Sequence, residues 1–517
     1  MLSQTDNLID MLYSSVQTQS NKDAVVWDDQ PTSYECLWLA CTQFAALLQD
    51  HGVGSGDRVI LQLSNSAEFF HAYYGVLMCR AVAVPIFHGS SPARLATLVN
   101  LSGATTIVTE HSDITLLLEE LKPHLEGPAP VIVDLRGPRP NRSVSERPAQ
   151  DDLAMLQYTS GTTGNPKGVM LTHGNLLANI RQMIPAAQFE PEDVFVSWLP
   201  VYHDMGLITM TMCPFYLGAK LVLLPISPKP FTWFSAIARH RGTMTASPDF
   251  GYRFATKFTR RSKYDLRSLR RALIAAEPVR ASTIERFEEK FDLNGVLKPG
   301  YGLAEASVAA SFWHMDRQDR LIDEEGHVSA GKSIPGMEIA IEGTAEPYVQ
   351  GEILIKGPNC TQGYYRNPEA TAALKGPNGF LRTGDVGYLD SEGHLFIVGR
   401  AKNIIIRAGR NLAPREIEEV AEEVPGVRLA AAIGVDAGGI EGEQIILFCE
   451  WERGRASDDD QAELVRQLQQ HTHENLGYRP DKVMLVKPQS IPRTYNGKLQ
   501  YSALKAEYLK NKRHIHD

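Results

Sequence analysis

Ten residues from Thr159 to Gly168, with the sequence TSGTTGNPKG, gather groups that could bind phosphate. Hydroxyls stand at Thr159, Ser160, Thr162 and Thr163, glycines at Gly161, Gly164 and Gly168, and an ammonium at Lys167. A flexible loop so rich in hydrogen-bond donors can wrap a polyphosphate. It is not a Walker A loop, because Lys167 lies between Pro166 and Gly168 instead of between a glycine and a Ser or Thr. The order of these groups favours phosphate binding over an ordinary Ser/Thr/Gly turn.

Two other short motifs contain an isolated charged side chain. Glu305 stands among small residues in YGLAEA, residues 301–306, and suits Mg²⁺, which proteins usually hold through one or two carboxylates and substrate phosphate. The alternative for Glu305 is an acid at the start of a helix, where it complements the helix dipole. Lys498 ends the segment Tyr-Asn-Gly-Lys and by itself would be interpreted as a solvated lysine of a hairpin.

The elements that must position these groups alternate between short β-rich runs and longer helical stretches. The first runs are RVILQL (58–63), NSAEFFHAYYGVLMCR (65–80), AVAVPIF (81–87), TTIVT (105–109) and VIVDL (131–135). Such alternation indicates βαβ units on a parallel sheet. It resumes after a Pro/Arg-rich loop at 137–148. The phosphate loop follows LAMLQY and leads into VMLTHGNLLANI, which favours a strand, the loop and then a helix.

From residue 399 onward the pattern predicts a compact α+β unit. It contains the strand-like runs IIIR, RLAAAIGV, EQIILFCEWE and KVMLVK and the helical stretches PREIEEVAEEV and DDQAELVRQLQQHTHENLG. About 115 residues are a normal size for one small domain. We therefore expect an N-terminal domain at 1–398, a C-terminal domain at 399–517 and a hinge near Asn403.

Length and composition agree with a multidomain globular protein. A single hydrophobic core rarely grows beyond about 250–300 residues, and the chain has 517. Its net charge of −9 argues against a protein that coats nucleic acid or anionic lipid, so an anionic partner needs a local site. The six cysteines lack the spacing of a zinc site or disulfide framework, and no secretory signal or membrane-spanning run is evident. These features favour the cytoplasm.

The phosphate loop and four further segments together resemble the adenylate-forming superfamily of acyl-CoA synthetases, luciferases, peptide-synthetase adenylation domains and fatty acyl-AMP ligases. The further segments are YGLAEA, LRTGDVG (381–387), GRAKNIIIRAGRN (399–411) and IPRTYNGK (491–498). They occur in the family's order and cover essentially the whole chain. The resemblance implies an α/β fold class, with a large multi-layer N-terminal domain and a small mobile C-terminal cap. It also implies ATP and Mg²⁺.

The resemblance assigns roles to residues at the matching positions. Nucleotide-binding residues would be Thr159, Ser160, Gly161, Thr162, Thr163, Gly164, Ala276, Glu277, Pro278, Tyr301, Gly302, Asp385 and Arg400. Tyr301 would lie against the adenine, Asp385, after a tight turn at Gly384, would accept hydrogen bonds from both ribose hydroxyls, and Arg400 would reach the ribose or the α-phosphate. Catalytic residues would be Lys498, Glu305 and Lys167, with Glu305 the metal ligand. A turn aspartate that bonds its own backbone is the alternative for Asp385.

Within the superfamily, five features look most like fatty acyl-AMP ligases: LQYTSGTTG, WLPVYHDMGL (198–207), the AAEPVRASTIERF segment from residue 275, YGLAEAS, and Arg410 of GRN, where CoA ligases more often carry glycine. The resemblance implies an acyl group passed from acyl-AMP to the phosphopantetheine of an acyl carrier protein, with substrate-binding residues His203, Asp204 and Met205. Between Glu305 and Gly331 the chain is short, and a segment typical of those ligases, held to discourage CoA use, is missing. An acyl-CoA ligase is therefore the second candidate.

Two further alternatives stay open from the sequence. Amino-acid adenylating relatives hold the substrate ammonium with an aspartate, for which Asp204 and Asp249 are the candidates, although Asp204 is also a favoured cap for the apolar helix expected from Met205. A non-catalytic nucleotide-binding protein would have been favoured by loss of Lys498, Glu305 or Asp385, and all three are present.

Overall fold

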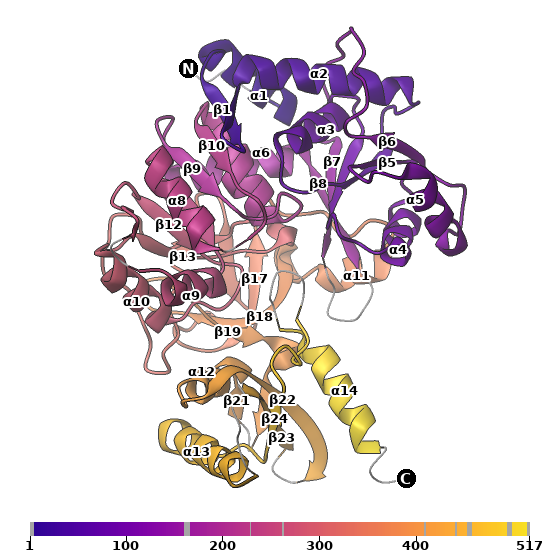
Figure 1. Cartoon of the computed structure of the whole chain (residues 1–517). Coiled ribbons are helices and arrows are strands. Elements are labelled where there is room, and N and C mark those ends of the chain that lie inside the picture. The colour runs from indigo at the N-terminus through magenta and orange to yellow at the C-terminus, as the bar shows by residue number, and fades with distance from the viewer. Residues whose placement is uncertain are drawn as a thin grey trace.

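The computed structural model describes residues 5–159, 166–227, 229–260, 263–407, 410–439, 442–451, 458–493 and 499–513. Four β-sheets and the helices around them form two parts of unequal size (Figure 1). The large part, in indigo to salmon, contains three of the sheets, and the smaller part, in orange to yellow, contains the fourth. None of the described helices is long and apolar enough to cross a membrane.

The first large sheet has six strands in the order β6-β5-β3-β4-β7-β8. They are β3 (Arg58–Gln62), β4 (Val82–Ile86), β5 (Thr106–Thr109), β6 (Val131–Asp134), β7 (Leu153–Thr159) and β8 (Lys167–Thr172). The first five are parallel, and β8 returns antiparallel to β7. β4 is buried along its whole length, as expected for an apolar strand covered on both faces. The predicted βαβ units are thereby confirmed.

The second large sheet has nine strands in the order β15-β14-β13-β12-β11-β9-β10-β1-β2. They are β1 (Asp23–Trp27), β2 (Gln30–Ser33), β9 (Val194–Ser197), β10 (Lys220–Leu223), β11 (Met244–Ser247), β12 (Arg271–Ile274), β13 (Leu297–Tyr301), β14 (Ser311–Phe312) and β15 (Lys332–Ser333). The central strands are parallel, and β2, β14 and β15 run antiparallel at the edges.

Helices surround these two sheets (Figure 1). They are α1 (Leu8–Gln19), α2 (Tyr34–Asp50), α3 (Ala67–Met78), α4 (Pro92–Ser102), α5 (Ile114–Leu121), α6 (His173–Ala187), α7 (Cys213–Leu217), α8 (Pro230–His240), α9 (Asp249–Phe258) and α10 (Ala281–Phe291), with α11 (Pro368–Leu374) further along the chain. One apolar cluster joins side chains from Leu8 to Leu395 and forms the main core.

A four-stranded antiparallel sheet lies between the large sheets and the C-terminal part (Figure 1). Its strands are β16 (Glu338–Ile341), β17 (Gly351–Lys356), β18 (Leu381–Leu389) and β19 (Leu395–Arg400). The C-terminal part follows directly. It contains β20 (Ile405–Arg407), β21 (Arg410–Leu412), β22 (Val427–Gly439), β23 (Gly442–Trp451) and β24 (Lys482–Val486), with α12 (Pro414–Glu422), α13 (Asp458–Leu476) and α14 (Tyr501–Arg513).

The C-terminal part has apolar clusters of its own, one centred on Ile405 and Ile417 and another on Ile433 and Leu504. A smaller cluster, which includes Val398, Ile404 and Ala413, spans the connection between the two parts. The predicted strands and helices after residue 399 are confirmed. The boundary between 398 and 399 and the hinge near Asn403 stay predictions.

Two local predictions are wrong. The segment after the phosphate loop first forms strand β8, which includes Val169–Thr172 of the predicted helix, and helix α6 begins only at His173. Thr172 caps this helix by accepting a hydrogen bond from the amide of Asn175. The expected tight turn at Gly384 is instead an interior position of strand β18, where Gly384 has φ +72° beside a register shift in the pairing with β17.

Candidate active site

A cavity of about 1200 Å³ lies between the large part and the C-terminal part. It opens at the carboxyl ends of the parallel strands β9, β11, β12 and β13, where the chain runs on into His203, Asp249, Ala276 and Tyr301. Ligands of open α/β sheets usually bind outside these strand ends. The other wall comes from the C-terminal part and includes Glu422 of α12.

The predicted phosphate loop connects β7 to β8 at this cavity. Residues 160–165, which include Ser160, Gly161, Thr162, Thr163 and Gly164, lie outside the described part of the chain. The two residues that flank the loop, Thr159 and Lys167, are paired across the strands, and both line the cavity. Lys167 Nζ lies 5.0 Å from the centre of the Tyr364 ring. The strand pairing therefore brings both ends of the loop to the cavity.

Glu305 lines the same cavity. It belongs to a single 3₁₀ turn, Ala304–Ala306, directly after strand β13. Its Oε1 accepts a hydrogen bond of 2.7 Å from the Tyr364 hydroxyl. The carboxylate is half-buried and lines the cavity, so it offers oxygen to a hard cation there.

Both carboxylate oxygens of Asp385 contact other side chains. Its Oδ2 accepts 2.7 Å from the Tyr301 hydroxyl, and its Oδ1 lies 2.8 Å from Arg400 Nε. Arg400 also donates to the carbonyl of Thr383. The structure thus brings together Tyr301, Asp385 and Arg400, which come from strands β13, β18 and the end of β19. Both of these partners of the Asp385 carboxylate are side chains from other strands.

The segment Ala276-Glu277-Pro278 forms another wall of the cavity. Ala276 has φ +69°, a conformation that costs energy for a residue other than glycine and is common at ligand sites. Glu277 Oε1 accepts 2.6 Å from the amide of Phe250. Gly302, also at the cavity, is required by packing, because a Cβ there would lie 1.7 Å from the carbonyl oxygen of Val308.

His203, Asp204 and Met205 line the cavity together. His203 Nδ1 lies 2.5 Å from Asp204 Oδ1, and the same oxygen accepts 2.7 Å from the amide of Met205. The helix expected from Met205 is confirmed over Met205–Met212, where it is a π-helix. Met210 and Met212, further along this helix, belong to the core, whereas Met205 lines the cavity.

Asp249 is buried, with 2% of its side chain exposed. Its Oδ2 lies 2.8 Å from Arg253 Nε, and its Oδ1 accepts 3.1 Å from the amide of Arg280. Asp204 and Asp249 are therefore both engaged by other groups of the protein.

Lys498 lies outside the described residues, but the chain on each side of it does not. Arg493 and Leu499 pair as an antiparallel bridge, and both line the cavity. Arg493 Nη2 donates 3.2 Å to Glu450 Oε1, and Tyr501 donates 3.1 Å to Glu418 Oε2. The segment that contains Lys498 is thus attached on both flanks.

Three residues that the sequence patterns did not single out also contribute to the cavity. Lys402, inside the segment GRAKN, is an exposed residue that also lines the cavity, and partial desolvation of its ammonium there, followed by repulsion from Arg400 and Lys167, lowers its pKa. Tyr364 holds Glu305. Glu418 of α12 is fully buried, and burial raises its pKa to about 8. Lys402 could have been found from its motif, whereas Tyr364 and Glu418 carry no local signal.

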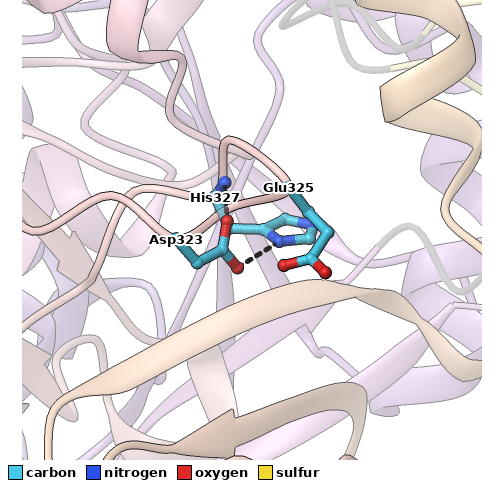
Figure 2. Close-up of side chains that lie close together, drawn as sticks. All are labelled: Asp323, Glu325 and His327. Atoms are coloured by element: carbon cyan, nitrogen blue, oxygen red, sulfur yellow. Dashed lines mark hydrogen bonds and ion pairs between the residues drawn. The ribbon is translucent and has the colours of Figure 1, made fainter. Parts of the chain in front are cut away.

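A metal could in principle also be held by Asp323, Glu325 and His327, whose ligand atoms lie within 4.8 Å of one another (Figure 2). His327 Nδ1 lies 2.6 Å from Asp323 Oδ2, which also accepts 2.6 Å from the Tyr388 hydroxyl. His327 Nε2 lies 3.6 Å from Glu416 Oε1 of α12. Burial alone would lower the pKa of His327, but its bonds to Asp323 and Glu416 raise it to about 9. The close approach of these side chains is therefore explained by a protonated His327 between the carboxylates of Asp323 and Glu416.

Comparison with known proteins agrees with this geometry. The profile of the AMP-binding enzyme family matches residues 12–365, and that of the AMP-binding enzyme C-terminal domain matches residues 416–498. The chain is 32% identical to a medium-chain-fatty-acid acyl-carrier-protein ligase of Moorena producens, over 97% of this chain and 95% of the relative. It is 31% identical to a long-chain-fatty-acid–AMP ligase of Mycobacterium bovis, over 88% of this chain and 87% of the relative.

Solved structures with a similar fold include a relative of the same kind. A structure from a study of fatty acyl-adenylate ligases of E. coli and L. pneumophila superposes with a TM-score of 0.88 at 28% identity, covering 100% of this chain and 99% of that chain. The predicted α/β architecture, a large N-terminal part with a smaller C-terminal one, is confirmed.

Proposed function

Because the chain belongs to the AMP-binding enzyme family, we propose that it activates a fatty acid with ATP as acyl-AMP and transfers the acyl group to the phosphopantetheine thiol of an acyl carrier protein. In the first step a carboxylate oxygen attacks the α-phosphorus of ATP, and the bond to pyrophosphate breaks. In the second step the thiol sulfur attacks the acyl carbon, AMP leaves, and the thiol proton is released. The observation that carries the proposal is a single cavity lined by positively charged side chains, by the carboxylate of Asp385 and by apolar side chains.

The polar side of the cavity suits the nucleotide. Lys167, Arg400 and Lys402 bring positive charge to it, which would attract and hold the phosphates. Asp385 would accept hydrogen bonds from the ribose hydroxyls, and Tyr301 with Ala276 would line the adenine. The loop residues 159–164 would bond the phosphate oxygens. These roles follow from the motifs and the lining of the cavity.

Mg²⁺ is implied by the reaction, and Glu305 fits it. The carboxylate lines the cavity, Tyr364 fixes one of its oxygens, and oxygen ligands are those Mg²⁺ prefers. When bound, the ion would neutralise charge on the phosphate oxygens. Lys498 would pair with the substrate carboxylate and the α-phosphate as charge shifts between them. No general base is needed, because a carboxylate is already a nucleophile.

The apolar part of the cavity lining favours an unaminated, mainly apolar substrate. Met205, Phe250, Leu303 and Val308 are among the residues that line the cavity. Asp204 is bonded to His203 and Asp249 to Arg253, so neither is set aside for a substrate ammonium. These contacts support a fatty acid over an amino acid, which stays the further alternative.

Straight-chain acids of increasing length should show rising and then sharply falling pyrophosphate exchange. Each methylene buried in an apolar pocket contributes about 0.8 kcal/mol, so two added carbons should raise the apparent affinity about tenfold until the pocket ends. Exchange is measured beside the common amino acids. Activity confined to one amino acid, and lost on Asp204→Ala or Asp249→Ala, would instead identify an amino-acid adenylating enzyme.

A phosphopantetheinylated carrier protein should be acylated faster than free CoA at equal concentration. The support is the similarity to the acyl-carrier-protein ligase of Moorena producens and to fatty acyl-AMP ligases. Both thiols are offered together, and the products are quantified by mass spectrometry. Preferential formation of acyl-CoA would make the chain an acyl-CoA ligase, the second candidate.

A further inference from the structure

Helix α12 carries charged side chains along one face. Arg415, Glu418, Glu419 and Glu422 are spaced i, i+3, i+4 and i+7, which places them on the same side of a helix. Ile417 and Ala421 are buried in the apolar cluster of the C-terminal part, so the helix is anchored there. Its charged face is then available to the large part of the molecule.

This face is bonded to the large part at Arg280, the residue that precedes helix α10. Arg280 Nη1 lies 2.5 Å from Glu422 Oε2, and Arg280 Nε lies 3.3 Å from Glu419 Oε1. Arg253 Nη1 also reaches Glu422 Oε2, at 3.3 Å. Arg415 of α12 also donates a hydrogen bond to the carbonyl oxygen of Val279 in the large part. These bonds all cross between the two parts.

These groups are shielded from water. The side chains of Arg280 and Glu422 are 15% and 10% exposed. Burial opposes the charge of Arg280, but Glu422, Glu419 and Asp249 together raise its pKa above the ordinary value. Removing one partner of such a pair leaves an uncompensated buried charge, so these contacts matter more than surface ion pairs do.

The same helix also holds the chain that follows Lys498. Glu418, one helical turn before Glu422, accepts 3.1 Å from the hydroxyl of Tyr501. Tyr501 begins α14 and stands three residues after Lys498. Helix α12 meets the large part again through Glu416, whose Oε1 lies 3.6 Å from His327 Nε2. Helix α12 therefore connects the large part directly to the flank of the lysine segment.

We propose that Arg280, Glu419 and Glu422 form an interdomain clasp that positions the Lys498 segment for acyl-AMP formation. The three are positioning residues, since they act through α12 and Tyr501 on the segment. The inference rests on the proposed function, in which Lys498 serves the formation of acyl-AMP. It assigns a role to Arg280, a residue of the AAEPVRASTIERF segment to which the sequence motifs gave none.

The clasp is tested first with Glu419→Gln/Glu422→Gln. Glutamine keeps the size of the side chain and can still accept the bond that Glu422 receives from the amide of Ala430. Pyrophosphate exchange should fall by about tenfold or more, while thiol acylation from supplied acyl-AMP stays within about twofold. The matched control is Glu423→Gln, because Glu423 bonds only His471 of its own domain among the described contacts and should leave both steps unchanged. An equal loss of both steps would overturn the clasp.

A conservative variant separates positioning by charge from a general structural role. Arg280→Lys keeps the positive charge facing Glu419 and Glu422 and should retain a substantial part of the exchange, whereas Arg280→Gln should lose it as the glutamine variant of the two glutamates does. An equal loss of exchange in both Arg280 variants would overturn the pairing.

Trypsin cleavage after the exposed Lys402 gives a readout that does not depend on activity. Lys402 lies in the connection between the two parts, so a broken clasp should speed cleavage in Glu419→Gln/Glu422→Gln and leave Glu423→Gln at the wild-type rate. Unchanged cleavage would overturn the clasp. A wild-type chain without exchange for any acid would contradict the proposed function, and cleavage would then decide the clasp alone.

Discussion

Replacing Lys498 by alanine should reduce acyl-AMP formation by about 10²–10³-fold while transfer from supplied acyl-AMP continues. An electrostatic group in a water-excluded site typically contributes about 2.7–4 kcal/mol to the transition state, which corresponds to this factor. The chain on both sides of the lysine, at Arg493 and Leu499, lines the cavity. The first step is measured by pyrophosphate release and the second by acylation of the carrier thiol.

The matched control for this lysine is Lys505→Ala. Lys505 belongs to α14, is 40% exposed and pairs with Glu443, so its loss should change neither step. If Lys498→Ala impaired both steps equally, the lysine would be structural and its assignment to the first step wrong.

Replacing Asp385 by alanine should weaken ATP binding by about 10²–10⁴-fold. Two hydrogen bonds from the ribose to a charged acceptor would disappear, at about 1.5–3 kcal/mol each. The carboxylate also holds Tyr301 and Arg400, which would lose a shared partner inside the cavity. Binding is measured by calorimetry with ATP, and the concentration dependence of exchange gives an independent value.

Asp385→Asn is the control for shape, since it keeps an acceptor oxygen and loses the charge. It should fall between the wild type and the alanine variant. Unchanged ATP affinity in Asp385→Ala, with a folded protein by thermal unfolding, would contradict the ribose assignment and leave Asp385 as an organiser of Tyr301 and Arg400.

The fold could be predicted from the sequence wherever local pattern decides it. Runs such as residues 58–63 and 131–135 are short, apolar and β-branched, and they form the expected parallel strands. The segment 169–172 favours a helix by sequence, although an apolar run of that length fits both periods. Pairing with β7 makes it a strand, and that pairing is a tertiary contact.

The candidate site could be predicted only as far as motifs reach. Glu305, Asp385 and Lys167 stand out by their neighbours in the sequence and all line one cavity. The contact of Arg280 with Glu422 joins residues 142 positions apart, and neither the AAEPVRASTIERF segment that contains Arg280 nor the helical stretch that contains Glu422 indicates that the two meet. Such pairs depend on how the two parts pack against each other, and the spacing of residues within one motif carries no information about that packing.

The π-helix at Met205–Met212 affects how the length of this segment can vary. Its turn holds a surplus residue relative to an α-helix, and the hydroxyl of Thr211 bonds the carbonyl of Gly206 five positions back. The flanks of such a turn keep the register that they would have around an α-helix shorter by one residue, because the wider winding takes up the extra residue. Deleting one residue here should therefore return the segment to α-helical winding with His203 and Asp204 still at the cavity wall, whereas the same deletion in an ordinary α-helix turns one flank by about 100° relative to the other. A length difference of one residue is consequently easier to accommodate in this segment than in the neighbouring helices.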